Sequence, residues 1–118
     1  AEACVHGGLF GLWTGCGIEV GSWLHLNRLA HGTVEEVRTL AAGRGTGRGP
    51  EDRWRAGLAF AAQEILQAAT SEDDLRALQR EVLWPIEDDF IASPRSLTTA
   101  TADLCLAVVR ATEERQHR

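Results

Sequence analysis

The sequence predicts an all-α protein, a compact bundle of five or six helices joined by short loops. Apolar residues recur along most of the chain at steps of three and four, the spacing of one face of an α-helix. No segment shows the sustained apolar–polar alternation of a half-buried strand. Residues that begin and end helices separate the periodic segments. With 118 residues, 44% hydrophobic and 25% charged, the chain is expected to form a single domain over residues 1–118.

The first segment, residues 3–26, is apolar and contains six glycines. Gly7, Gly11 and Gly15 lie four apart, so on a helix they form a smooth strip against which another backbone packs closely. The charge of Glu19 and the dilution of the apolar run by glycine argue against a membrane-spanning helix. We expect a tightly packed core helix, broken near Gly15–Gly17 because an interior glycine destabilises a helix by about 1 kcal/mol.

The next two helices are marked by their ends. A helical pattern over residues 20–30 is followed by Gly32, a typical residue just after a helix C-terminus. Thr33 then begins a second helix, because residues 33–36 (TVEE) form a capping box in which hydroxyl and carboxylate each accept a backbone N–H. Gly43 ends this helix. The glycine- and arginine-rich stretch that follows is expected to be a flexible loop, since a phosphate-binding P-loop needs a preceding strand and a lysine.

The two longest helices have continuous apolar stripes. The first begins at Pro50, which is favourable in a first helical turn, and carries Glu51 and Asp52 beside the positive end of the helix dipole. Its stripe consists of Trp54, Leu58, Ala61, Ala62, Ile65 and Ala69. The last helix is expected to begin at Ser93 or Ser96. Its stripe consists of Leu97, Ala100, Leu104, Ala107, Val108 and Ala111.

Between these two helices the sequence predicts one further helix. Thr70 and Ser71 are capping residues, and three acids follow them in the first turn. Pro85 is expected to end this helix at Trp84, because the residue before a proline is disfavoured in the helical conformation. Residues 86–92 (IEDDFIA) are expected to form only a short helical turn, with its acids in solvent.

Charge and cysteine content exclude several classes of function. The net charge is −5, and residues 51–92 carry ten acids against four arginines. An acidic centre without a basic stripe argues against nucleic acid as a partner. The three cysteines, Cys4, Cys16 and Cys105, are an odd number without CxxC spacing. This usage argues against a disulfide framework or a zinc ribbon and is typical of a cytoplasmic protein.

A polar row crosses the otherwise apolar segment. Glu19, Ser22 and His25 are spaced by three, so on a helix they lie on one sloping face that Arg28 continues. Cys16 lies between two glycines one turn before this row, where a thiol has little bulk around it. Two interpretations remain open: an acid/base or thiol site, or a solvated row beside an inert core cysteine.

Metal binding is not expected. His25 and His31 are six residues apart, a spacing that does not place two ligands on one face of a helix. We therefore predict neither a metal nor another cofactor.

Several stretches between residues 14 and 66 fall at positions compatible with one known family. They are Thr14-Gly15-Cys16, Glu19, Arg28, residues 33–37 (TVEEV), residues 50–53 (PEDR), Leu58 and residues 64–66 (EIL). In these stretches the chain resembles the carboxymuconolactone decarboxylase / alkylhydroperoxidase-D-like family, whose members are all-α and oligomeric. The redox members carry a CxxC motif, whereas here Glu19 stands at the second position. The histidine expected one turn later is replaced by Trp23, with His25 two residues away. The resemblance therefore implies a degenerate member.

Two functions from different classes follow, and the sequence leaves open whether the protein is an enzyme. The first is a non-catalytic module that binds a protein partner or forms a homo-oligomer through the glycine-faced N-terminal helix. Its expected interface residues are Gly7, Gly11, Gly15, Trp23, Arg28 and His31. The second is a degenerate alkylhydroperoxidase-like enzyme that uses a thiol or acid/base step, with Cys16, Glu19 and His25 as catalytic residues.

Overall fold

A computed structural model describes residues 20–43 and 48–117, and all regular structure in these residues is helical. The elements are α2 (Val20–His31), α3 (Val34–Ala41), α4 (Pro50–Ala68), α5 (Glu72–Leu78), the π-helical turn η2 (Gln79–Leu83), α6 (Trp84–Ala92) and α7 (Leu97–Gln116). Because α5, η2 and α6 follow one another without a break, the described chain forms five helical segments. The predicted all-α helical bundle is confirmed. Residues 3–19 of the helical segment expected over residues 3–26 lie outside the described residues.

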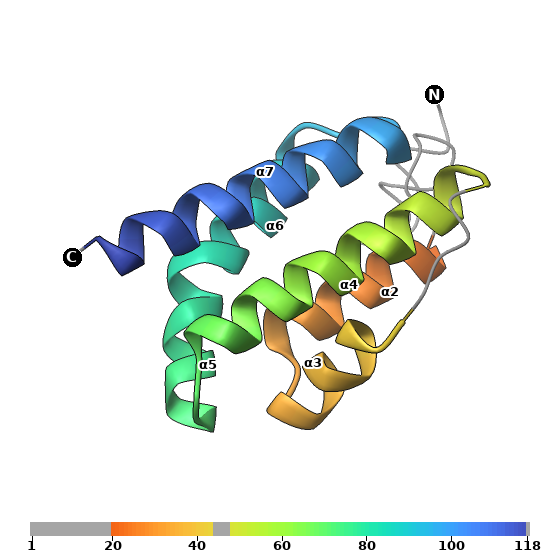
Figure 1. The fold of residues 1–118 in the computed structure, drawn as a ribbon. Helices are drawn as coiled ribbons and strands as arrows, with labels where there is room; N and C mark the ends of the chain where they lie inside the picture. Colours follow the sequence, from red (N-terminus) through yellow and green to blue (C-terminus); the bar gives the residue numbers. More distant parts are fainter. Residues whose placement is uncertain (1–19, 44–47, 118) are drawn as a thin grey trace.

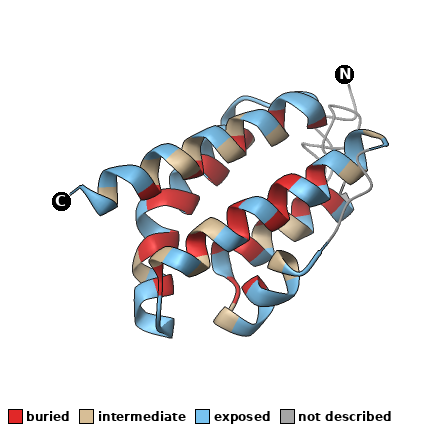
Figure 2. Ribbon diagram, in the orientation of Figure 1, coloured by how far each residue is buried: buried red, intermediate tan, exposed pale blue. Residues whose placement is uncertain are grey.

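The helices pack in two layers around one apolar core (Figure 1). The two longest helices, α4 and α7, lie side by side and run in the same direction, while α2 and α3 pack on the other side of α4. Buried residues follow the inward faces of all these helices and belong to a single cluster (Figure 2). Its largest fully buried side chains are Trp23, Trp54 and Phe90. Among the described residues, no helix combines the length and the hydropathy that a membrane crossing requires.

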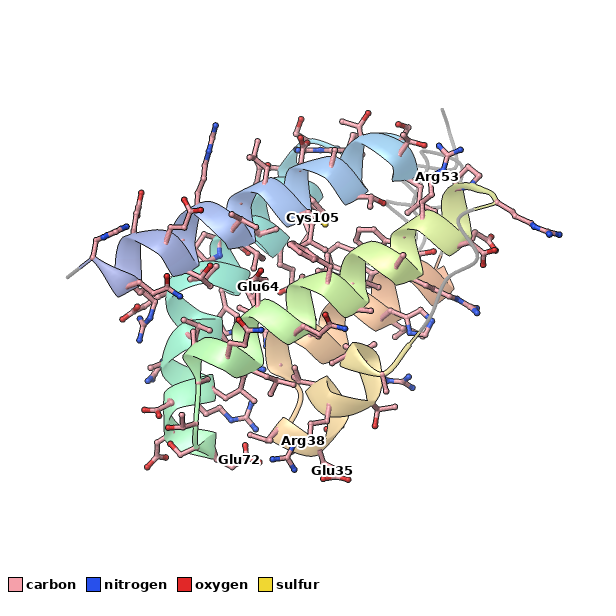
Figure 3. The ribbon with its side chains drawn as sticks, viewed as in Figure 1. Glu35, Arg38, Arg53, Glu64, Glu72 and Cys105 are labelled. Atoms are coloured by element: carbon pink, nitrogen blue, oxygen red, sulfur yellow. The ribbon has the colours of Figure 1, made fainter. Side chains whose placement is uncertain are left out.

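A glycine sets the distance between α4 and α7. A Cβ atom added at Gly57 would lie 2.6 Å from Thr101 Cγ2, which is too close for two carbon atoms that are not bonded to each other. The thiol of Cys105 donates to the Gly57 carbonyl with a sulfur–oxygen distance of 3.6 Å. Figure 3 shows Cys105 between the two helices. The close contact of α4 with α7 therefore depends on the missing side chain at this position.

The predicted helix starts are confirmed by their hydrogen bonds. Thr33 and Glu36 form the complete capping box, each side chain accepting the other residue's backbone N–H at 3.2 Å. Ser71 caps α5 by accepting the N–H of Asp74, and α4 begins at Pro50. Of the two serines proposed for the last helix, Ser96 is the capping residue. These side chains satisfy N–H groups that have no partner inside their helices.

The prediction that a helix ends at Trp84 is wrong. The chain remains helical through Pro85, and residues 86–92 belong to α6 rather than to an isolated turn. In a regular α-helix the ring of Pro85 would meet the carbonyl of the residue four positions earlier. The turn η2 avoids this conflict because its hydrogen bonds span five residues: the N–H of Trp84 donates to the carbonyl of Gln79. The wider turn lets the helix continue past the proline.

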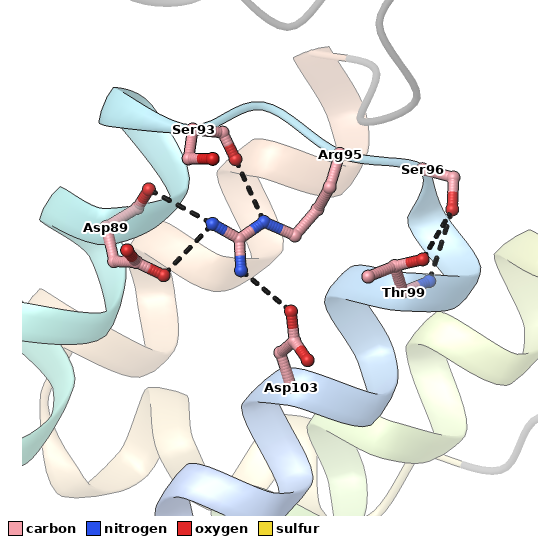
Figure 4. Close-up of polar contacts among 6 residues, drawn as sticks. All are labelled: Asp89, Ser93, Arg95, Ser96, Thr99 and Asp103. Carbon is pink, nitrogen blue, oxygen red and sulfur yellow. Dashed lines mark hydrogen bonds and ion pairs between the residues drawn. The ribbon is translucent and has the colours of Figure 1, made fainter.

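Arg95 joins α6 to α7 (Figure 4). Its guanidinium donates to the Asp103 carboxylate at 2.7 Å, to the Asp89 carboxylate at 3.0 Å and, through Nε, to the Ser93 carbonyl at 2.9 Å. The same group lies 4.7 Å from the centre of the Phe90 ring, a cation–π distance. These contacts fix the short connection between the two helices.

Candidate functional site

The structure describes only part of the predicted catalytic centre. Cys16 and Glu19 lie outside the described residues, so the proposed grouping of Cys16, Glu19 and His25 stays a prediction. The glycine strip of Gly7, Gly11 and Gly15 also lies outside. The candidate residues that the structure describes are Trp23, His25, Arg28 and His31, and all four lie on α2.

The polar row of α2 runs from the core to the surface. Ser22 is buried, with 9% of its surface exposed, His25 is half-buried and Arg28 is exposed. The indole N–H of Trp54 donates to the Ser22 carbonyl at 3.1 Å and attaches this part of α2 to α4. The polar row predicted for α2 is therefore present from Ser22 onward, and of these residues only Arg28 is exposed to solvent.

His25 lies beside two hollows in the surface. The larger, of about 310 Å³, lies between α2, α3 and α4; the smaller, of about 150 Å³, lies between α2 and α4. Its Nδ1 atom is buried and has no hydrogen-bond partner among the described residues. Burial, together with the positive charges of Arg28 and Arg55, lowers the pKa of His25 below its ordinary value of 6.5. The imidazole is therefore uncharged at neutral pH.

Side chains from α5, η2 and α6 bind the C-terminal end of α2. The last carbonyls of a helix have no partner within the helix and must be satisfied by other groups when they are buried. Here these carbonyls belong to residues 29–32, and each accepts a side-chain hydrogen bond. Gln79 Nε2 donates to Leu29 and Gly32 at 3.1 and 2.9 Å, Trp84 Nε1 to Ala30 at 3.0 Å, and Arg76 Nη1 to His31 at 2.9 Å.

At the same end of α2, two aromatic side chains are exposed but held in place. His31 Nε2 lies 2.8 Å from Glu87 Oε1, and the His31 ring lies 5.5 Å from the Trp84 ring. The side chains of His31 and Glu87 are 39% and 11% exposed, and Trp84 is 41% exposed. The second carboxylate oxygen of Glu87 is buried and has no partner within the part of the chain that is described. The mostly buried carboxylate of Glu87 therefore fixes the position of the more exposed His31 ring.

The expected interface residues on α2 do not all face the same way. Trp23 is fully buried and belongs to the core, so its side chain offers no surface to a partner. Arg28 and His31 are exposed, and Leu24 is 42% exposed. Arg28 lies four residues after Leu24 and His31 lies three residues after Arg28, so the three side chains share one face of the helix. An exposed apolar residue thus lies on the face that carries two of the predicted interface residues.

Sequence reasoning missed the buried roles of Gln79 and Glu87. Glu87 was expected to be one of three solvated acids, but it is buried against α2. A signal was present: Gln79 lies four residues after Leu75, and Glu87 lies three residues before Phe90. Gln79 therefore falls on the apolar stripe of the predicted helix itself, and Glu87 does so once the helix is continued past Pro85.

Cys105 shows the environment of an inert cysteine. It is half-buried, and burial raises the pKa of its thiol above the ordinary value. Since the thiolate is the reactive form, this cysteine is unreactive at neutral pH. Within residues 20–43 and 48–117, no three His, Cys, Asp or Glu side chains gather closely enough to bind a metal ion.

Comparisons with protein-family models, with curated proteins and with solved structures found no match to this chain. The resemblance of residues 14–66 to the alkylhydroperoxidase-D-like family therefore stays a prediction.

Proposed function

We propose that this protein is a non-catalytic module that assembles with a second copy of itself through an exposed strip of α2 and α6. The strip consists of Leu24, Arg28, His31 and Trp84, and we call it the α2–α6 strip. One observation supports the proposal most directly. The His31–Trp84 pair is exposed by about two fifths, yet both rings are held by hydrogen bonds to Glu87 and to the Ala30 carbonyl.

Rigid exposed aromatic side chains are favourable contact residues. Ordering a flexible side chain at an interface costs about 0.5–1.5 kcal/mol, and a ring that is already fixed avoids most of this cost. Tryptophan and arginine are also enriched among the residues that contribute most to binding. The strip combines Trp84 with Arg28 and adds an apolar side chain, Leu24, on the same face of α2.

A second copy is the partner that the charges of the strip favour. Arg28 lies in the α2 half of the strip, one turn after Leu24, and Asp88, one turn after Trp84 on α6, is an exposed acid beyond the other end. A two-fold symmetric dimer brings the same surface of both chains together in opposite directions. Such pairing sets the positive end of each strip against the acidic end of the other. The glycine strip of residues 7–15 stays a prediction of a further contact surface.

Substitution of Leu24 by glutamate tests this proposal. The side chain is exposed, so the fold is kept, while a negative charge is introduced at the α2 end of the strip, which faces the acidic end of the partner strip in the proposed dimer. We expect the wild-type protein to form dimers in analytical ultracentrifugation and L24E to be monomeric. The measurement should extend to about 1 mM protein. A dimer with a dissociation constant of about 1 mM, which corresponds to a binding free energy of about −4 kcal/mol, is then still detected.

Leu106 provides the matched control, because it is an exposed leucine, 50% accessible, on α7. L106E should leave the dimer intact. A wild-type protein that is monomeric throughout the concentration range would refute self-assembly. Dimers that dissociate in L106E but not in L24E would place the interface on another face.

A second candidate function is the thiol or acid/base enzyme centred on Cys16, Glu19 and His25. The observation that favours it is the uncharged imidazole of His25, whose buried Nδ1 has no partner among the described residues. A general base must be unprotonated at the working pH.

Mass spectrometry after mild peroxide treatment tests the second function. We expect selective oxidation of Cys16, no oxidation in C16S, and an unmodified Cys105 as internal control, because burial raises the pKa of that thiol. Equal oxidation of all three cysteines, or none at Cys16, contradicts an activated thiol.

A further inference from the structure

The larger hollow beside His25 has the lining of a binding site. It encloses about 310 Å³, at the small end of the range of sites for small molecules. Its lining comes from α2, α3 and α4 and from the residue Gly43 just after α3: His25, Arg28, Thr39, Leu40, Gly43, Arg55 and Leu58. The lining thus combines three nitrogen-bearing side chains and one hydroxyl with two leucine side chains.

The positive groups of this hollow lack partners within the described chain. No carboxylate of a described residue lies within ion-pair distance of Arg28 or Arg55, in a protein whose net charge is −5. Both guanidinium groups are close enough to His25 to lower its pKa. Two arginines beside His25 therefore line the hollow without an ion-pair partner among the described residues, although Glu51 and Glu36 line the neighbouring hollows.

We infer that this hollow binds a small organic anion, a carboxylate with an apolar body. The planar guanidinium group matches the two oxygens of a carboxylate and forms two parallel hydrogen bonds with it. Leu40 and Leu58 supply the apolar surface for the rest of the ligand. This inference goes beyond self-assembly, because the hollow lies on the α3–α4 side of α2, away from Trp84, and shares only Arg28 with the α2–α6 strip.

His25 has a defined place in this site. The residue lines both the larger hollow and the smaller one, and its buried Nδ1 lacks a partner among the described groups. As a neutral imidazole it carries one N–H, which can donate to a carboxylate oxygen. A ligand carboxylate in the hollow would thus supply the counter-charge that Arg28 and Arg55 lack among the described residues, beside the neutral ring of His25.

A titration with benzoate, followed by amide NMR of the full chain, tests the inference. We expect saturable shifts of residues in α2, α3 and α4, and an affinity about tenfold weaker in R55Q, which lacks one charge-assisted pair. Arg53 offers the matched control: it is exposed on the same helix, and Figure 3 shows it on the side of α4 that faces α7. R53Q should bind benzoate as the wild type does.

Acetate and inorganic phosphate separate the parts of the proposal. Benzoate should bind more tightly than either, because only benzoate adds apolar contact to the charge. Phosphate binding equal to that of benzoate would overturn the assignment to an apolar carboxylate. Equal losses in R55Q and R53Q, or no saturable binding of benzoate, would overturn the site itself. The L24E variant should bind benzoate normally, so failure of self-assembly and failure of this site are distinguishable.

Discussion

Replacing Gln79 by leucine is expected to lower the free energy of unfolding by about 2–4 kcal/mol, since an unpaired buried polar group costs about 1–3 kcal/mol. The side chain is 1% exposed, and its amide donates to two carbonyls at the end of α2. Leucine matches its size but offers no donor. The carbonyls of Leu29 and Gly32 would then be buried with fewer hydrogen bonds, and the contact of Gln79 Oε1 with Arg76 would also be lost.

Urea denaturation followed by circular dichroism measures this effect. Gln67→Leu is the control: it makes the same change at an exposed position of α4, where we expect a difference within about 0.5 kcal/mol. Gln79→Glu keeps the shape but replaces the donor by an acceptor, and it should destabilise at least as much as leucine. If Q79L and Q67L unfold at the same urea concentration, the side-chain bonds to α2 contribute nothing to stability.

Much of the fold follows from local signals in the sequence. The capping box of Thr33 and Glu36, the start of α4 at Pro50 and the cap of α5 at Ser71 were predicted correctly. Each of these features depends on residues within one helical turn, where backbone geometry leaves few alternatives. The apolar stripes of α4 and α7 were also correct, because periodicity over many residues averages out local exceptions.

The end of α2 could not be predicted in the same way. Its side-chain partners, Gln79 and Glu87, lie about 50 residues further along the chain, and no local pattern pairs them with α2. The wrong prediction that the helix ends before Pro85 also hid the contact of Glu87 with α2. A helix that stops at Trp84 leaves Glu87 in solvent, whereas the π-helical turn carries it into contact with His31. Choices between distant partners depend on tertiary packing, which one sequence does not show.

The pair of His31 and Glu87 predicts an asymmetric response to substitution. His31→Ala should destabilise the fold by about 1–3 kcal/mol, because it leaves a mostly buried carboxylate without its partner. Glu87→Gln should cost less than about 1 kcal/mol, since the neutral amide keeps the shape and one hydrogen bond. The double variant should be more stable than the sum of the single changes predicts, because the isolated carboxylate is then absent. Thermal unfolding of the four proteins measures the coupling.

The same variants separate a structural role of Glu87 from a role in assembly. E87Q leaves His31 and Trp84 in the strip but loosens the contact that orients the imidazole, so self-association should weaken several-fold while the fold stays intact. Glu113→Gln, which removes an exposed carboxylate on α7, is the matched control and should change neither property. Dimers of E87Q as tight as those of the wild type would show that Glu87 supports only the fold. A rigid His31–Trp84 pair would then contribute to binding through its surface alone, and W84A rather than E87Q would become the variant that weakens the dimer.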